Sequence, residues 1–255
     1  MDENKELVRQ QFGANAEKYV QSQDHAQGAS LARLVRLTRP QPDWAVLDVS
    51  TGGGHTALTF APLVARVVAT DLAPGMLAAA EAHARAQGAL NIRFQLADAE
   101  NLPFEDDEFD LVTNRIALHH FSDAPRALAE FARVIRRGGL VALVDNIVPP
   151  DEETAAYVNR FEKVHDPSHH WAYPLGTLQE AMRQAGLELE HVETLKKDRD
   201  LDAWADRSGA SPETKEMLTN MLRDIPSGAK AFLNPRESNG RWIFTLEEAI
   251  LIARK

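Results

Sequence analysis

Short apolar runs alternate with helical segments between residues 44 and 144, and this alternation restricts the fold more than any other feature. The five runs are rich in Val, Leu and Ala and stand at 44–49, 66–71, 92–96, 109–113 and 140–144. Strands that are apolar along their whole length are typical of a parallel sheet covered by helices on both faces. Right-handed crossovers then predict a doubly wound α/β fold of the Rossmann-like type.

The intervening helices are marked by their terminal residues. Pro74 stands in the first turn of a helix over 74–87, and Gly88 follows its end. Asp123 is the predicted N-cap of the next helix, which we expect Gly138 to end. Further helices are expected at 175–185, 201–207 and 212–223, with strands near 187–196 and 249–253. The segment before the first strand is predicted to be helical, with one apolar face formed by Leu7, Val8, Phe12, Ala16 and Tyr19.

Charge and cysteine content exclude several classes of protein. The chain has 28 Lys and Arg against 38 Asp and Glu, a formal net charge of −10, and no cysteine. Disulfides, thiolate zinc sites, iron–sulfur clusters and cysteine nucleophiles are therefore excluded. An acidic chain lacks the basic face that phosphate contacts need, so we expect no nucleic-acid partner. The acidic run at 105–108 is predicted to be a solvated loop, because like charges repel.

No apolar stretch approaches the roughly 18 residues of a membrane span. The chain also shows no basic segment followed by an apolar run near its first residue. We therefore expect a cytoplasmic protein with no membrane partner.

Polar residues and glycines follow the first four strands, at the sheet edge where such folds bind ligands. They are Asp48 with Gly52–Gly54, then Asp71, Asp98, and Asn114 with Arg115. Glycines allow a ligand to approach the backbone closely, and a following helix N-terminus presents free amide hydrogens. An acid after the second strand is placed to accept hydrogen bonds from two ribose hydroxyls.

Two cofactor classes fit this edge. Gly52, Gly54 and Ala57 formally match the dinucleotide fingerprint. A pyrophosphate would, however, bring two negative charges among Asp48, Asp71 and Asp98, and no Lys or Arg lies among residues 46–65. A sulfonium cofactor is attracted by the same acids. We therefore expect S-adenosyl-L-methionine and keep a nicotinamide or flavin dinucleotide as the alternative.

The same edge resembles the motifs of class I S-adenosylmethionine-dependent methyltransferases. Residues 46–54 resemble the first motif, an acid followed by glycines at alternating positions, with Ser50 where the family most often has its first glycine. Asp71 matches the ribose-binding acid of the family. Later motifs are matched by residues 98–104, 109–112 and 133–139.

Within this class the chain resembles the ubiquinone/menaquinone C-methyltransferase-like branch, and the YcgJ-type proteins over nearly its whole length. The features that carry this likeness lie at 12–19, 117–121, 166–169 and 202–209. The resemblance implies a mostly parallel seven-stranded sheet with an N-terminal helical lid at 1–39 and a cofactor-binding core at 40–150. A C-terminal part at 151–255 would complete the sheet, with a helical cap over the acceptor at about 200–240. Cofactor contacts are implied for Tyr19, Asp48, Ser50, Gly52, Gly54, Asp71, Leu72, Asp98, Ala99, Glu100, Asn114 and Arg115.

Methyl transfer is an in-line displacement, so alignment in a dry cleft supplies much of the acceleration. A base is needed only if the acceptor loses a proton. The candidates are His119, His120 and His169, with a structural role as the alternative for each. His165, His169 and His170 lack the spacing of a compact metal site, so no metal is expected. Trp204 and Phe232 are candidates for the wall of the acceptor pocket.

Together these features predict a methyltransferase acting on a small-molecule acceptor, as a monomer or homodimer. Residues 114–117 lack the Asn/Asp-Pro-Pro-aromatic arrangement used on amino groups of bases, which argues against nucleic-acid methylation. The alternatives are a dinucleotide-dependent oxidoreductase and a non-catalytic cofactor-binding protein of the same fold. The acceptor atom stays open among oxygen, nitrogen and carbon.

Overall fold

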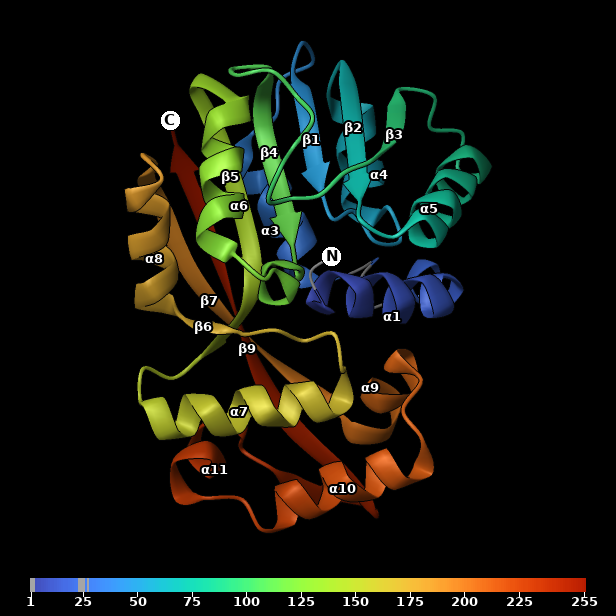
Figure 1. Ribbon diagram of the computed structural model, residues 1–255, viewed down its shortest axis with the longest axis vertical. Helices are drawn as coiled ribbons and strands as arrows, with labels where there is room; N and C mark the ends of the chain where they lie inside the picture. The colour runs from blue at the N-terminus through green and yellow to red at the C-terminus, as the bar shows by residue number, and fades with distance from the viewer. Residues whose placement is uncertain (1–2, 23–25, 27) are drawn as a thin grey trace.

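The computed structural model describes residues 3–22, 26 and 28–255, and the chain is built around one nine-stranded sheet (Figure 1). The seven main strands have the order β3-β2-β1-β4-β5-β9-β7, with short β6 beside β5 and short β8 beside β9. Strands β1 to β5 pair in parallel, and β9 is antiparallel to both β5 and β7. The prediction of a doubly wound, mostly parallel sheet with seven main strands is confirmed.

Each predicted strand is present, and the later ones are longer than expected. The strands are β1 (Ala45–Val49), β2 (Arg66–Asp71), β3 (Ile92–Leu96), β4 (Phe109–Arg115), β5 (Ile135–Val148), β6 (Tyr173–Pro174), β7 (Glu188–Asp200), β8 (Arg236–Ser238) and β9 (Arg241–Arg254). The α-helices are α1 (Glu3–Val20), α3 (Ala29–Thr38), α4 (His55–Phe60), α5 (Pro74–Ala86), α6 (Ala124–Val134), α7 (Glu152–His165), α8 (Leu175–Gln184), α9 (Leu201–Ser208), α10 (Pro212–Arg223) and α11 (Ser227–Leu233). The sequence patterns missed α7 and α11.

Successive residues of the central strands belong to two different cores. Val46 and Val67 pack with residues of α3 and α4 on one face of the sheet. Leu47 and Val68 pack with residues of α6 and α8 on the other face. Because side chains alternate along a strand, an all-apolar strand feeds both cores at once.

A third core lies in the other half of the molecule, below α1 as drawn in Figure 1. It contains Phe161 of α7, Trp204 of α9 and Phe244 of β9, with further residues of α10 and α11. The long strands β7 and β9 extend from the main sheet into this half (Figure 1). Helices α9 to α11 lie between β7 and β9 in the sequence, where a helical insertion before the last strand was predicted.

One helix end differs from the expectation. Helix α6 ends at Val134 and β5 begins at the next residue, so the prediction that Gly138 ends this helix is wrong. The pairing of β4 with β5 shifts register here, and Gly138 adopts a φ of +78° inside the irregular stretch. A glycine with positive φ marks a strand irregularity as well as it marks a helix end.

Helix α1 lies across the carboxyl ends of β1, β2 and β4 (Figure 1). Ala16 is buried on its inner face, whereas Leu7 is 39% exposed, so Leu7 does not belong to the predicted apolar face. Of the predicted lid segment 1–39, residues 1, 2, 23–25 and 27 lie outside the described residues. In the part of the chain that the structure describes, no helix is long and apolar enough to cross a membrane.

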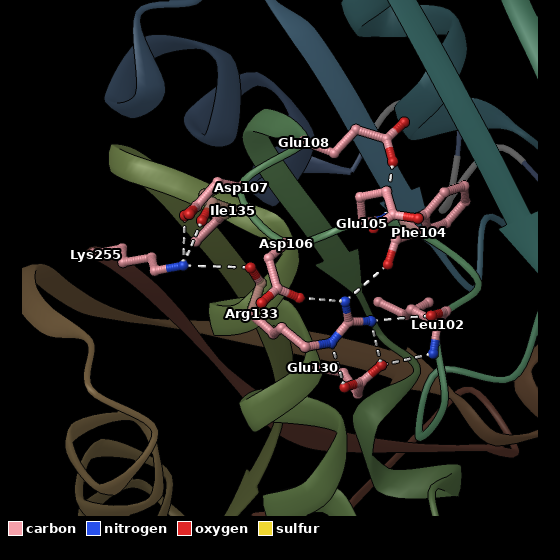
Figure 2. A network of polar contacts seen from close by, with 10 residues as sticks. All are labelled: Leu102, Phe104, Glu105, Asp106, Asp107, Glu108, Glu130, Arg133, Ile135 and Lys255. Carbon is pink, nitrogen blue, oxygen red and sulfur yellow. Dashed lines mark hydrogen bonds and ion pairs between the residues drawn. The ribbon is translucent and has the colours of Figure 1, made fainter.

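The acidic loop at 105–108 is largely exposed, as predicted, and two of its four acidic side chains pair with basic side chains (Figure 2). Arg133 of α6 pairs with Asp106 at 2.9 Å, and Lys255 pairs with Asp107 at 2.7 Å. Arg133 also donates to the carbonyl oxygens of Leu102 and Phe104, at 3.0 and 2.7 Å. These contacts anchor the loop that follows the predicted site residues 98–100.

Candidate functional site

A cleft opens at the carboxyl ends of the central strands, beneath α1. Ten of the twelve predicted cofactor residues line it: Tyr19, Asp48, Ser50, Gly52, Asp71, Leu72, Asp98, Ala99, Glu100 and Arg115. The other two stand outside the lining. Gly54 is the N-cap of α4, and Asn114 is fully buried with its Nδ2 donating to the Val49 carbonyl at 3.0 Å.

The loop after β1 owes its shape to three residues in the left-handed region. Ser50, Gly52 and Gly54 have φ values of 55°, 55° and 82°. Gly52 lines the cleft, and a Cβ added there would meet no heavy atom within 4 Å. The backbone at Gly52 therefore faces open space that a ligand can approach closely. Ser50 adopts the same conformation with a side chain, which costs free energy.

Asp71 at the end of β2 holds the loop after β1 through a hydrogen bond to its backbone. Its Oδ2 accepts from the Gly52 amide and its Oδ1 from the Ala73 amide, both at 3.0 Å. Burial raises the pKa of Asp71 to about 6, although the backbone hydrogen bonds oppose this shift. Each carboxylate oxygen keeps a further lone pair for a ligand.

Asp48 supports the loop from beneath. Its carboxylate accepts from the Thr51 hydroxyl at 2.6 Å and from the Thr113 hydroxyl at 2.7 Å. The side chain is 1% exposed, and burial raises the pKa of Asp48 against these hydrogen bonds. Asp48 thus ties the loop after β1 to the neighbouring strand β4.

Two cations reach the cleft from outside residues 46–65. Lys5 of α1 lies 2.7 Å from Asp98 and 2.5 Å from Glu100. Arg115 of β4 donates to the Thr56 hydroxyl at 3.1 Å. Lys5 is far from the motifs in the sequence, and no local pattern indicated it. Among the described residues the lining contains four carboxylates and two fixed cations, so an excess of negative charge remains.

A second cavity adjoins the cleft and shares Phe12, Tyr19, Ile116 and His120 with it. Most of its other walls come from α7, β7, α9 and β9, and of these α9 lies within the segment at about 200–240 that was expected to cap the acceptor. Trp204 lines this cavity, with His165 stacked on its ring at a centroid distance of 3.5 Å. Phe232 packs against the third core and is not among the lining residues, so its predicted place in the pocket wall is wrong.

The three candidate bases are all buried and line the second cavity. The Nδ1 of His119 lies 2.5 Å from the carboxylate of Asp145, which raises the pKa of His119 despite its burial. His120 Nδ1 donates to the Ser168 carbonyl at 3.1 Å, and burial lowers the pKa of His120 to about 4.

The third candidate, His169, donates from Nε2 to the Asn159 side-chain oxygen at 2.8 Å. Burial and the neighbouring histidines lower its pKa, so the ring is neutral. Across the described residues, no group of three or more histidines and carboxylates is arranged to hold a metal ion.

Two functional candidates were missed by the sequence analysis. Asp145 lies on β5 beyond Val144, where the strand was expected to end, whereas β5 continues to Val148. Glu162 is buried on α7 and lines the second cavity. The sequence signal was a glutamate on the same helix face as Ala155 and Val158. A charged residue on an apolar helix face is seldom buried without a partner or ligand, so its position indicates a functional role.

Comparison with known proteins identifies methyltransferases as relatives of this chain. Residues 47–143 match the family model described as a methyltransferase domain. The uncharacterized methyltransferase YcgJ of Bacillus subtilis is 33% identical over 242 residues, which cover 94% of this chain and 96% of that one. Demethylmenaquinone methyltransferase of Thermus thermophilus is 40% identical over 120 residues, covering 46% of this chain and 54% of that protein.

Solved structures agree with these sequence matches. The crystal structure of Bacillus subtilis YcgJ has a TM-score of 0.85 at 31% identity, covering 89% of this chain and 97% of that one. A Bacillus halodurans C-125 protein thought to be a methyltransferase also has a TM-score of 0.85, at 35% identity, covering 89% of this chain and 99% of that one.

Proposed function

This chain belongs to the class I S-adenosylmethionine-dependent methyltransferases, and on that basis we propose that it methylates a small-molecule acceptor bound in the second cavity. The observation that supports this proposal is the pair of adjoining cavities, which share the walls formed by Phe12, Tyr19, Ile116 and His120. A cofactor in one cavity and an acceptor in the other would face each other across that shared wall.

The residues of the first cleft fit the chemical groups of S-adenosylmethionine. We assign the ribose hydroxyls to Asp71, whose two oxygens retain lone pairs beside the open backbone of Gly52. Leu72 and Ala99 supply apolar walls for a flat ring. The excess of carboxylates over cations in the lining favours a positively charged cofactor over a pyrophosphate. Membership in a methyltransferase family also argues against a dinucleotide as the cofactor.

When bound, S-adenosylmethionine would supply a methyl group on a positively charged sulfur: the acceptor would form a bond to the methyl carbon in line with the breaking carbon–sulfur bond, and S-adenosylhomocysteine would leave as a neutral thioether. Helix α1 lines the cleft with Lys5, Val8, Phe12 and Tyr19, and we assign to this helix the exclusion of water from bound ligands. Phe12 and Tyr19 of the same helix hold the acceptor side of the shared wall. The chain's contribution is thus alignment of two ligands in a dry site.

Where the acceptor must lose a proton, we assign its removal to His119. The hydrogen bond from Nδ1 to Asp145 fixes the ring and leaves Nε2 as the nitrogen that can accept a proton. Asp145 also stabilises the positive charge that forms on the ring. The lowered pKa values of His120 and His169 make these rings weak bases, suited to holding an acceptor by hydrogen bonds.

Two measurements test the proposal. Calorimetric titration should show binding of S-adenosylhomocysteine and no binding of NADH. Incubation with methyl-labelled S-adenosylmethionine and a mixture of small metabolites should then produce a labelled product, detected by mass spectrometry. Binding of NADH alone would contradict the cofactor assignment. Cofactor binding with no transfer to any acceptor class would favour the non-catalytic alternative.

A further inference from the structure

Among the described residues that line the second cavity, Glu162 carries a buried carboxyl oxygen with no hydrogen-bond partner, and Nδ1 of His165 is likewise without one. Glu162 lies on α7, is 5% exposed and lines the cavity. Its Oε1 is buried and has no hydrogen-bond partner among the described residues. A buried carboxyl oxygen without a donor is unfavourable, so such a group points to a ligand that supplies the donor.

The neighbouring carboxylates are held by the protein itself. Asp145 accepts from the ring and the backbone amide of His119. Asp166 accepts from the backbone amide and the hydroxyl of Ser168, at 2.8 and 2.6 Å. Glu162 therefore differs from the carboxylates around it, and its open oxygen is a specific property of this position.

The charges around Glu162 restrict what the donor can be. His119 and Arg199 act on it as positive groups and Asp166 and Asp145 as negative ones, and burial raises the pKa of Glu162 to about 7. Arg199 and Arg207 both line the cavity. A protonated amine would add positive charge beside these groups, and a carboxylate ligand would bring no donor. A neutral hydroxyl supplies the hydrogen bond without adding charge.

We propose that the second cavity binds a neutral small molecule through a hydroxyl group that donates a hydrogen bond to Glu162 Oε1, which makes Glu162 a specificity-determining residue for the methyl acceptor. This inference rests on the proposed function, because it takes the second cavity as the acceptor site. Glu162 anchors the acceptor and is not assigned the proton transfer.

Three probes that share one aromatic ring test the inference. p-Cresol carries a neutral hydroxyl, benzylamine a positive charge and benzoate a negative charge. Their affinities are measured by ligand-observed NMR on protein saturated with S-adenosylhomocysteine. We expect p-cresol to bind the wild-type protein more tightly than either charged probe.

Two variants then locate the effect at Glu162. Glu162→Leu removes the acceptor oxygen and should weaken p-cresol binding at least about tenfold. Glu162→Asp keeps the charge but draws the carboxyl back by one methylene, so it should also weaken p-cresol binding. This variant carries the test if Glu162→Leu does not fold. Glu152→Leu, at an exposed position of the same helix, is the matched control and should leave binding unchanged.

Thermal unfolding separates recognition from a structural role. Removing an unpartnered buried carboxyl should leave the midpoint of Glu162→Leu unchanged or higher. The inference is overturned if p-cresol binds the two Glu162 variants as tightly as wild type, or if benzylamine binds wild type best. Failure of p-cresol to bind wild type also overturns it. The proposed function fails separately, when the wild-type protein does not bind S-adenosylhomocysteine.

Discussion

His119 and Asp145 are joined by two hydrogen bonds, one from the ring Nδ1 to Oδ1 at 2.5 Å and one from the backbone amide to Oδ2 at 2.8 Å. The first bond favours the protonated ring, and the second fixes the carboxylate against the short helical turn that carries the histidine. Orientation and basicity of His119 are therefore set by one acidic side chain.

Replacing Asp145 with Asn should lower the pKa of His119, because the ring loses its negative partner while staying buried. NMR titration of the histidine ring carbons measures this shift directly. Asp43→Asn, at an exposed position, is the control. An unchanged titration of His119 would contradict the role given to Asp145.

The same substitution gives a pH-dependent loss of stability. The folded pKa of His119 lies above the value of 6.5 for the unfolded chain, so this pair stabilises the fold fully below that pH. The contribution is lost as the pH rises through the folded pKa. Denaturant unfolding should therefore show a difference between wild type and Asp145→Asn of about 3 kcal/mol at roughly pH 5 to 6 that shrinks at alkaline pH.

Asp71→Ala should weaken binding of S-adenosylhomocysteine by roughly 1–3 kcal/mol, because hydrogen bonds from ribose to a charged group are lost. Calorimetry on the variant and on the Asp43→Asn control measures the difference. Wild-type affinity should also fall below about pH 6, where the Asp71 carboxylate becomes protonated. Equal affinity of variant and wild type would remove Asp71 from the cofactor site.

Ser50→Gly should stabilise the protein by about 0.5–1 kcal/mol. Glycine adopts a positive φ without steric cost, and this gain exceeds the extra backbone entropy that glycine loses on folding. Ser238→Gly is the matched control, since Ser238 is exposed and is not among the residues with positive φ. The control should lose about 0.5–1 kcal/mol. Denaturant unfolding would contradict the strain at Ser50 if both variants shifted in the same direction.

Lys5→Met should loosen the contact of α1 with the cleft, because Lys5 bridges this helix to Asp98 and Glu100. Partly exposed ion pairs contribute about 1 kcal/mol or less, so global stability should change little. Hydrogen exchange of α1 amides should become faster, and S-adenosylhomocysteine should dissociate faster. Gln10→Met, exposed on the same helix, should leave both rates at the wild-type values.

The sequence predicted the parts of the site that depend on strand boundaries. Asp48 and Asp71 end short apolar runs, and the carboxyl edge of a parallel sheet brings such positions together. Asp145 was not predicted because β5 continues past the apolar stretch, where it pairs with β9 and, at Ile147 and Val148, with β6. Strand ends set by a distant partner are not encoded in the local pattern.

The second cavity was also less predictable, because its residues are brought together by contacts between distant parts of the sequence. Glu162, Arg199 and Trp204 come from a helix, a strand and another helix, which packing of the third core brings together. Their roles depend on burial and on neighbours distant in the sequence. Spacing along the chain carries no information on such neighbours.

Strand β9 passes without interruption from Phe244 in the third core to Ala253 in the main sheet. The two halves of the molecule therefore share one continuous strand, so we expect little change in the separation between the proposed cofactor cleft and the proposed acceptor cavity along β9. A different acceptor size must then be accommodated by side-chain replacement in the cavity wall. Under the proposed function, entry and exit of ligands would then require movement of α1, which lines both cavities through Phe12 and Tyr19.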